Sequence, residues 1–197
     1  GNLFVADRGN SRVTRKMTGT NIIIPAGATS ATLTISPSDD SIDEANETII
    51  LTPWAGGGGG ASLASSSDIT ITINDNDNPP LVTSVTSSTS NGSYKSGNTL
   101  SIQVVFDKAV TVTGTPQITL ETGDTDAVVN YTSGSESNTL TFNYTVAAGH
   151  TSSDLDYKAT NSLSLNSGTI KETGGTSAVT LTLPSPGASN SLGANKA

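Results

Sequence analysis

Apolar residues recur at every second position along most of this chain. Ile69, Ile71 and Ile73 alternate with threonines, and the segment 100–106 repeats the pattern with leucine, isoleucine, valine and phenylalanine. A period of two is typical of a β-strand with one buried face, and no window shows a convincing helical period. A chain this polar could be disordered, but regular alternation at modest net charge argues against disorder. The pattern therefore predicts an all-β fold.

The predicted strands fall into three parts of the chain: residues 1–16, 17–78 and 79–197. The first part reads as a β-hairpin, with a strand at 2–7, a turn at Gly9-Asn10 and a second strand from 11–13. Short strands separated by glycine, aspartate or proline turns predict a β-sandwich for the last part. The strands predicted after the hairpin are 22–24, 31–35, 48–52 and 69–73, then 82–85, 100–106, 110–112, 118–120, 129–131, 140–146, 155–157, 163–165 and 179–183.

The boundary between the second and third parts lies in the run Asn74–Pro80. Pro79 and Pro80 cannot donate hydrogen bonds to a strand ladder, so the strand at 69–73 and its domain end before them. The chain does not begin with Met and shows no signal peptide. We interpret it as a segment of a longer protein, whose export signal and anchor lie outside the segment.

The charge and composition of the chain limit the classes of partner that it can bind. The net charge is −8 and the pI is about 4.3, which disfavours nucleic acid, because binding phosphates requires clustered lysine and arginine. The chain has no cysteine for a disulfide and no apolar run of the length that spans a membrane. An acidic surface suits cations.

The densest cluster of carboxylates lies between two predicted strands. It consists of Asp39, Asp40, Asp43, Glu44 and Glu47. Calcium takes about 6–8 oxygen ligands and would convert the mutual repulsion of these groups into ligation. A solvated surface loop is the alternative interpretation.

A second acidic run, Asp75 and Asp77, follows the strand at 69–73. If that strand is antiparallel to the strand leading into the acidic loop at 39–47, both acidic segments can lie at the same end of the module. The sequence therefore predicts a calcium site from Asp39, Asp40, Asp43, Glu44, Glu47, Asp75 and Asp77.

Residues 20–77 resemble the second half of a Calx-β domain. The resemblance rests on IPAGATSATLTISPSDDSIDEANETIILTP followed by ITITINDND, in which Asp39-Asp40, Glu44 and Glu47 match the acidic loop and Asp75-Asn76-Asp77 the terminal run. It implies an immunoglobulin-like β-sandwich with calcium at the tip where the acidic segments meet. The first half of such a domain, which supplies further ligands, does not precede Ile22. The run NDNDNPP also resembles the calcium-binding linker of cadherins, which implies an interdomain role for Asp75 and Asp77.

Two weaker resemblances flank this module. The words GNLFVADRGNSRV resemble the core of an NHL repeat, the unit of a β-propeller blade, although an ordinary hairpin also explains them. Residues 79–197 resemble immunoglobulin-like modules of large bacterial surface proteins, on words such as YTSGSESNTLTFNYTV. That likeness implies a stalk or adhesive repeat.

Little in the sequence supports a catalytic or nucleotide-binding site, and we predict that the chain is not an enzyme. His150 is the only histidine and lies in a turn, whereas a catalytic triad needs a base, an acid and a nucleophile together. The glycines at 56–60 lack the lysine of a phosphate-binding loop. Trp54 reads as a core or edge residue rather than a sugar platform. Four further acids read as solvent-facing, with a second ion site as the alternative: Asp124, Asp126, Asp154 and Asp156.

These observations predict tandem immunoglobulin-like β-sandwich modules, the first one partial, from a large secreted or cell-surface bacterial protein. The expected function is structural and adhesive, in cell adhesion and cell communication, with calcium stiffening the domain junction. The expected partners are Ca²⁺, neighbouring β-sandwich modules of the same chain and a cell-surface or matrix ligand. The alternatives are a non-catalytic spacer or glycan-binding accessory module of an exported enzyme, and a calcium sensor.

Overall fold

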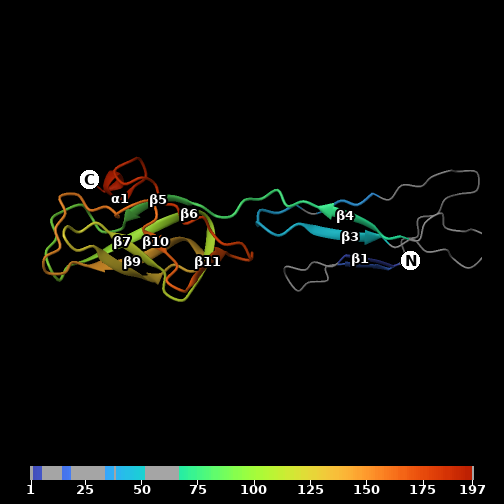
Figure 1. The fold of residues 1–197 in the computed structure, drawn as a ribbon, viewed down its shortest axis with the longest axis horizontal. Helices are drawn as coiled ribbons and strands as arrows, with labels where there is room; N and C mark the ends of the chain where they lie inside the picture. The colour runs from blue at the N-terminus through green and yellow to red at the C-terminus, as the bar shows by residue number, and fades with distance from the viewer. Residues whose placement is uncertain (1, 6–14, 19–33, 38, 52–66, 197) are drawn as a thin grey trace, which may run out of the picture. The chain divides into compact units, whose positions relative to one another are not determined.

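The computed structural model describes residues 2–5, 15–18, 34–37, 39–51 and 67–196. The chain divides into two compact units, Gly1–Asp77 and Asn78–Ala197. Figure 1 shows antiparallel strands in both units. Among the described residues, the helical content is a single turn near the C-terminus. The predicted all-β fold is therefore confirmed, and the immunoglobulin-like sandwich arrangement stays a prediction.

The first unit contains a four-stranded antiparallel sheet in the order β2-β1-β3-β4. Its strands are β1 (Asn2–Val5), β2 (Arg15–Thr18), β3 (Glu47–Leu51) and β4 (Ile69–Ile73). β1 pairs with β2 along its length and also meets β3, so the N-terminal strands share a sheet with the acidic module.

The structure of the first unit departs from two predictions. Thr34 and Ile35, the described residues of the strand predicted at 31–35, are not in a strand. β4 forms as predicted, but Ile69 is 55% exposed and Ile71 39% exposed, so here the alternation does not mark a buried face. The hairpin turn at 9–10, the strand start at 11–13, the strand at 22–24, Trp54 and the glycine run lie outside the described residues.

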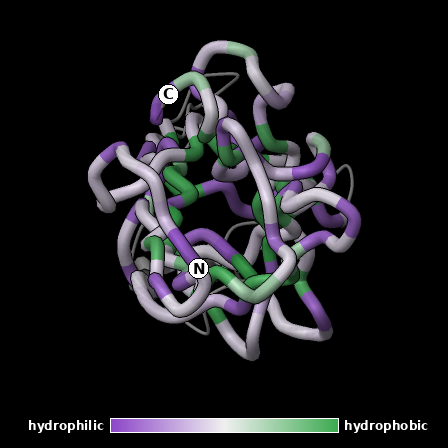
Figure 2. The backbone as a smooth tube through the Cα atoms, turned by 90° about the vertical axis from the view of Figure 1, so that its left-hand side faces the viewer, coloured by the Kyte–Doolittle hydropathy of each residue, from purple (hydrophilic) through white to green (hydrophobic). Residues whose placement is uncertain are grey.

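The second unit has a seven-stranded antiparallel sheet in the order β10-β7-β8-β9-β6-β11, with β5 also paired to β6. Its strands are β5 (Val82–Ser87), β6 (Thr99–Thr113), β7 (Gln117–Leu120), β8 (Ala127–Ser133), β9 (Ser137–Thr145), β10 (Leu163–Ser164) and β11 (Thr169–Glu172). The alternate apolar residues of these strands, among them Phe106 and Phe142, form one core together with buried residues outside the strands such as Tyr157. In Figure 2 the hydrophobic stretches, drawn in green, lie inside the surrounding polar loops.

β6 is one strand of 15 residues, although the sequence predicts two, at 100–106 and 110–112. Its register shifts between Val105 and Val110, the irregularity of a β-bulge. Before the shift β6 pairs with β5 and β9. After it, β6 keeps one pair with β9, Val110↔Ser137, and β11 takes the place of β5. The bulge therefore lets one strand exchange partners where the sequence suggests a turn.

Two predicted strands form no strand of their own. Leu155–Tyr157 and Val179–Leu183 contribute only single bridges, Leu120↔Tyr157 and Leu81↔Thr180 among them. Tyr157, Val179 and Leu183 are nevertheless buried, so their alternation reports burial rather than a ladder.

Two elements of the second unit were not predicted from the sequence. β11 carries one core isoleucine among polar residues, and the helix α1 (Leu192–Asn195) is shorter than any periodicity window. The Ser191 hydroxyl caps α1 by accepting from the Ala194 amide, and Leu192 is buried in the core. The described residues form no helix with the length and apolar character that crossing a membrane requires.

Candidate functional site: the acidic end of the first unit

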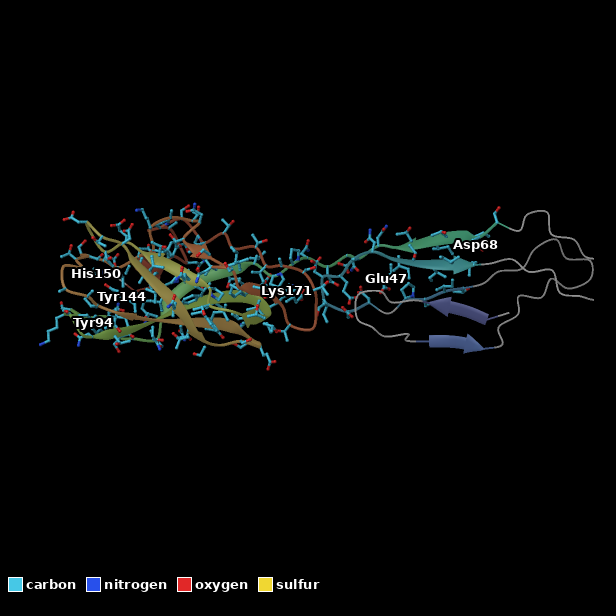
Figure 3. The ribbon with its side chains drawn as sticks, turned by 60° about the horizontal axis from the view of Figure 1, so that its bottom comes forward. Glu47, Asp68, Tyr94, Tyr144, His150 and Lys171 are labelled. Carbon is cyan, nitrogen blue, oxygen red and sulfur yellow. The ribbon has the colours of Figure 1, made fainter. Side chains whose placement is uncertain are left out.

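The pairing of β3 with β4 brings the two acidic segments to the same end of the sheet. Glu47, where β3 begins, lies opposite Ile73, where β4 ends. Figure 3 shows Glu47 at one end of this strand pair and Asp68, which precedes β4, at the other. The predicted convergence is present, but through the strand that leaves the acidic loop. The expectation had relied on an antiparallel pairing with the strand that enters the loop. That route was wrong, because a strand antiparallel to the entering strand ends at the opposite end of the sheet.

Two hydrogen bonds connect the acidic segments. The backbone amide of Glu44 donates to Oδ2 of Asp75 at 3.1 Å, and the amide of Asp75 donates to Oδ1 of Asn46 at 2.9 Å. Each segment thus holds a backbone donor of the other, which fixes the loop against the end of β4. A third bond shapes the loop itself, because the amide of Ile42 donates to Oδ1 of Asp40 at 2.8 Å, as in an Asx turn.

The acidic side chains differ in burial. Asp39 and Asp40 are exposed, whereas the remaining members of the predicted set are half-buried: Asp43, Glu44, Glu47, Asp75 and Asp77. The half-buried members are those nearest in sequence to the two hydrogen bonds and to the ends of β3 and β4. The structure therefore places the loop–strand contact at the Glu44–Asp75 end of the set.

The fit to a metal ion is incomplete. Carboxylate and amide oxygens suit a hard cation such as calcium. Among the residues that the structure describes, however, no group of three or more histidine, cysteine, aspartate or glutamate side chains is placed to hold a metal. The backbone brings the segments together, and the side chains do not form a ready cage.

Two of the four further acids of the second unit, Asp126 and Asp156, have structural partners. Asp126 pairs with Lys158, and this contact raises the pKa of the lysine. Asp156 accepts hydrogen bonds from the amides of Tyr157 and Gly187, each at 2.9 Å. Asp156 therefore organises backbone, which weakens the alternative of a second ion site with Asp154.

His150 belongs to an arrangement that sequence reasoning missed. The Tyr144 hydroxyl and His150 Nδ1 are 2.9 Å apart, and the two rings stack with centroids 5.9 Å apart. The available signal was a tyrosine at a buried position of the strongest predicted strand, followed six residues later by a histidine in the next turn.

Comparisons of the chain with protein-family models, with curated proteins and with solved structures give no match. The resemblances to Calx-β domains, NHL repeats, cadherin linkers and bacterial surface modules therefore stay predictions.

Proposed function

We propose that this chain is a calcium-dependent structural module of an extracellular adhesive protein, in which the ion stiffens the junction after β4. The observation that carries the proposal is the hydrogen bond from the Glu44 amide to the Asp75 carboxylate. It holds two acidic segments, which are separated by the whole β3–β4 hairpin, against each other.

The chain on either side of the unit boundary is anchored within its own unit. On the first side, Asn46 holds the amide of Asp75. On the second side, the Lys108 ammonium donates to the carbonyl of Asn78 at 2.7 Å, and the amide of Leu81 donates to the carboxylate of Asp107 at 2.9 Å. Only Asn76 and Asp77 lie between the anchored residues Asp75 and Asn78, so an ion on Asp75 and Asp77 would restrict a very short joint.

The expected affinity is low. A calcium ion requires several oxygens to converge, and here the exposed carboxylates of Asp39 and Asp40 would have to turn toward the ion. Such rearrangement lowers affinity, and extracellular calcium modules bind with dissociation constants of about 10⁻⁴–10⁻³ M. The net charge of −8 favours cation binding in general and keeps the surface soluble.

The test is a calorimetric melting curve of the whole chain in chelator and in about 10 mM calcium, with magnesium at equal ionic strength as the screening control. At the affinities above, this calcium concentration would stabilise the first unit by about 1.4–2.7 kcal/mol. The melting midpoint of that unit would then rise by several degrees in calcium and less in magnesium.

Two matched variants locate the effect. Asp75→Asn keeps an oxygen acceptor for the Glu44 amide but removes the charge, so we expect it to abolish the calcium response. Asp68→Asn removes an exposed charge at the opposite end of the same strand pair and should respond like the parent. A parent chain whose midpoint is the same in chelator and calcium would refute the proposal.

A further inference from the structure

The second unit contains a cavity of about 310 Å³. Its walls come from the segment that follows β5, the start of β6, the turn after β9 and the C-terminal segment with α1. Figure 3 shows Tyr94, Tyr144 and His150, which all line the cavity, at the same end of this unit. The volume is at the lower limit of the roughly 300–1,000 Å³ typical of small-molecule sites.

The cavity has an apolar floor. Leu100, Ile102 and Leu192 are buried core residues that also line it, and Val146 and Leu155 pack beside them. Leu100 and Ile102 belong to β6 and Leu192 to α1, so this part of the floor is as rigid as the core itself. A ligand with apolar C–H surface would bury that surface here.

The walls contain hydroxyl groups that already hold the backbone in place. The Ser87 hydroxyl donates to the carbonyl of Ser101 at 2.8 Å, and the amide of Ser101 donates to Oγ1 of Thr89 at 2.9 Å. On the opposite wall, the Thr122 hydroxyl donates to the carbonyl of Thr125 at 2.7 Å. These bonds make the walls a preformed frame.

Other polar groups of the lining are unused. Within the described part of the chain, six lining side chains make no hydrogen bond or ion pair: Ser90, Ser93, Thr151, Ser153, Asp154 and Lys196. They supply four hydroxyls, one carboxylate and one ammonium. A ligand would therefore meet donors and acceptors that do not have to leave an internal partner.

Tyr94 and the stacked pair Tyr144–His150 complete the lining. Tyr94 is 38% exposed, and its hydroxyl donates to the carbonyl of Ser90, which holds the ring at the mouth. On the inner side, the Tyr144 hydroxyl engages Nδ1 of His150, so Nε2 is the imidazole nitrogen left for a ligand. Burial raises the pKa of the Tyr144 phenol above its ordinary value.

We propose that this cavity binds a neutral saccharide of one or two rings. A sugar ring presents C–H groups on its faces and hydroxyls around its edge, which match an apolar floor, the Tyr94 ring and a rim of hydroxyl, carboxylate and imidazole groups. The lining contains one lysine and one carboxylate, so it has no excess positive charge to select a phosphate or a polyanion. Tyr94 is the one exposed large aromatic residue in the described chain, which favours a ring held end-on rather than a polymer lying on a flat aromatic row.

The test is saturation-transfer NMR on the whole chain, with amide shifts followed in parallel. The probes are glucose, galactose, N-acetylglucosamine, lactose, cellobiose and diacetylchitobiose. Each is used at about 10 mM, which exceeds the millimolar dissociation constants expected of a shallow site. At least one sugar should receive saturation and shift the amides of residues 90–94 and 150–155. Transfer to none of the six would overturn the proposal.

Variants tie the binding to the cavity. Tyr94→Ala and Asp154→Asn change exposed side chains, so the fold should survive, and each should weaken binding at least about fivefold. The controls are Val128→Ala and Asp124→Asn, exposed positions outside the cavity, and both should bind like the parent. Unchanged binding in both cavity variants would refute the assignment, as would inorganic phosphate shifting the same amides when no sugar does.

Discussion

The ammonium of Lys108 lies 3.2 Å from Oε1 of Glu172, whose side chain is only 4% exposed. Lys108 belongs to the bulge of β6 and Glu172 ends β11, the strand that pairs with β6 after the bulge. The same ammonium donates to the carbonyl of Asn78. One lysine thus neutralises a buried carboxylate and holds the first residue of the second unit.

Lys108→Met should destabilise the second unit markedly. It leaves the carboxylate of Glu172 buried without its cation and removes the donor to Asn78. Breaking a fully buried pair costs about 3–5 kcal/mol, and because Lys108 is 25% exposed we expect roughly 2–3 kcal/mol in urea unfolding. Lys171→Met is the matched control, since this lysine is exposed on the neighbouring strand, and it should change stability little. Equal losses in the two variants would contradict the role of Lys108.

The double variant separates the charge from the packing. Adding Glu172→Gln to Lys108→Met removes the buried charge, so the double variant should be more stable than Lys108→Met alone. A double variant whose loss of stability equals the sum of the two single losses would show that the charges do not interact.

Asn46→Ala probes the anchor of the acidic run. It removes the acceptor for the Asp75 amide, and because this hydrogen bond is exposed to solvent, its loss should lower the stability of the first unit by only about 0.5 kcal/mol. Asn76→Ala, an exposed asparagine in the same run, is the control and should be nearly neutral. Calorimetry of the first transition measures both, and a larger loss in Asn76→Ala would exclude the anchor.

Most strands could be predicted from the sequence because burial of one face imposes a period of two. That signal located β3 to β9 but misjudged β6, since a bulge and a turn both interrupt the alternation after Phe106. It also missed β11, where Ile170 is the only core aliphatic in four residues. Alternation reports which residues are buried in most of these strands, although not in β4, where Ile69 and Ile71 are exposed, and hydrogen-bond partners depend on tertiary structure.

The acidic site, too, could be predicted from the sequence only in part. Residue type and spacing identified the two carboxylate segments, and the pairing of β3 with β4 brings them together. The bond between the Glu44 amide and Asp75 was not predictable, because it depends on loop backbone conformation. The Tyr144–His150 pair was missed for a related reason: a strand residue and a turn residue share no periodic signal.

Tyr157 should make the second unit sensitive to alkaline pH. Its ring is buried, and burial together with the carboxylate of Asp156 raises the pKa of the phenol far above its ordinary value. Because the folded pKa exceeds the unfolded one, the stabilisation is complete below about pH 10 and is lost as pH rises from there toward the folded pKa. Urea midpoints of the second unit should therefore fall in that alkaline range.

Tyr157→Phe tests this origin. It also removes the hydrogen bond to the carbonyl of Pro184, so the variant starts less stable by about 1 kcal/mol at neutral pH. Its alkaline decline should be shallower than that of the parent, with a remainder from Tyr144, whose pKa burial also raises. Parallel declines in parent and variant would rule out Tyr157 as the source.

Alanine substitutions at Gly134 and Gly97 distinguish the cost of backbone strain from the cost of a steric clash. Both have positive φ, 109° and 91°, a region that side chains rarely adopt. A Cβ on Gly134 would overlap the carbonyl oxygen of Thr139, whereas a Cβ on Gly97 would meet nothing within 4 Å. Gly97→Ala should therefore lose only the backbone term, about 1 kcal/mol, and Gly134→Ala should lose at least about 2 kcal/mol more, because the turn between β8 and β9 must open. Urea unfolding of the two variants measures the difference, and equal losses would mean that the turn accommodates a side chain at residue 134.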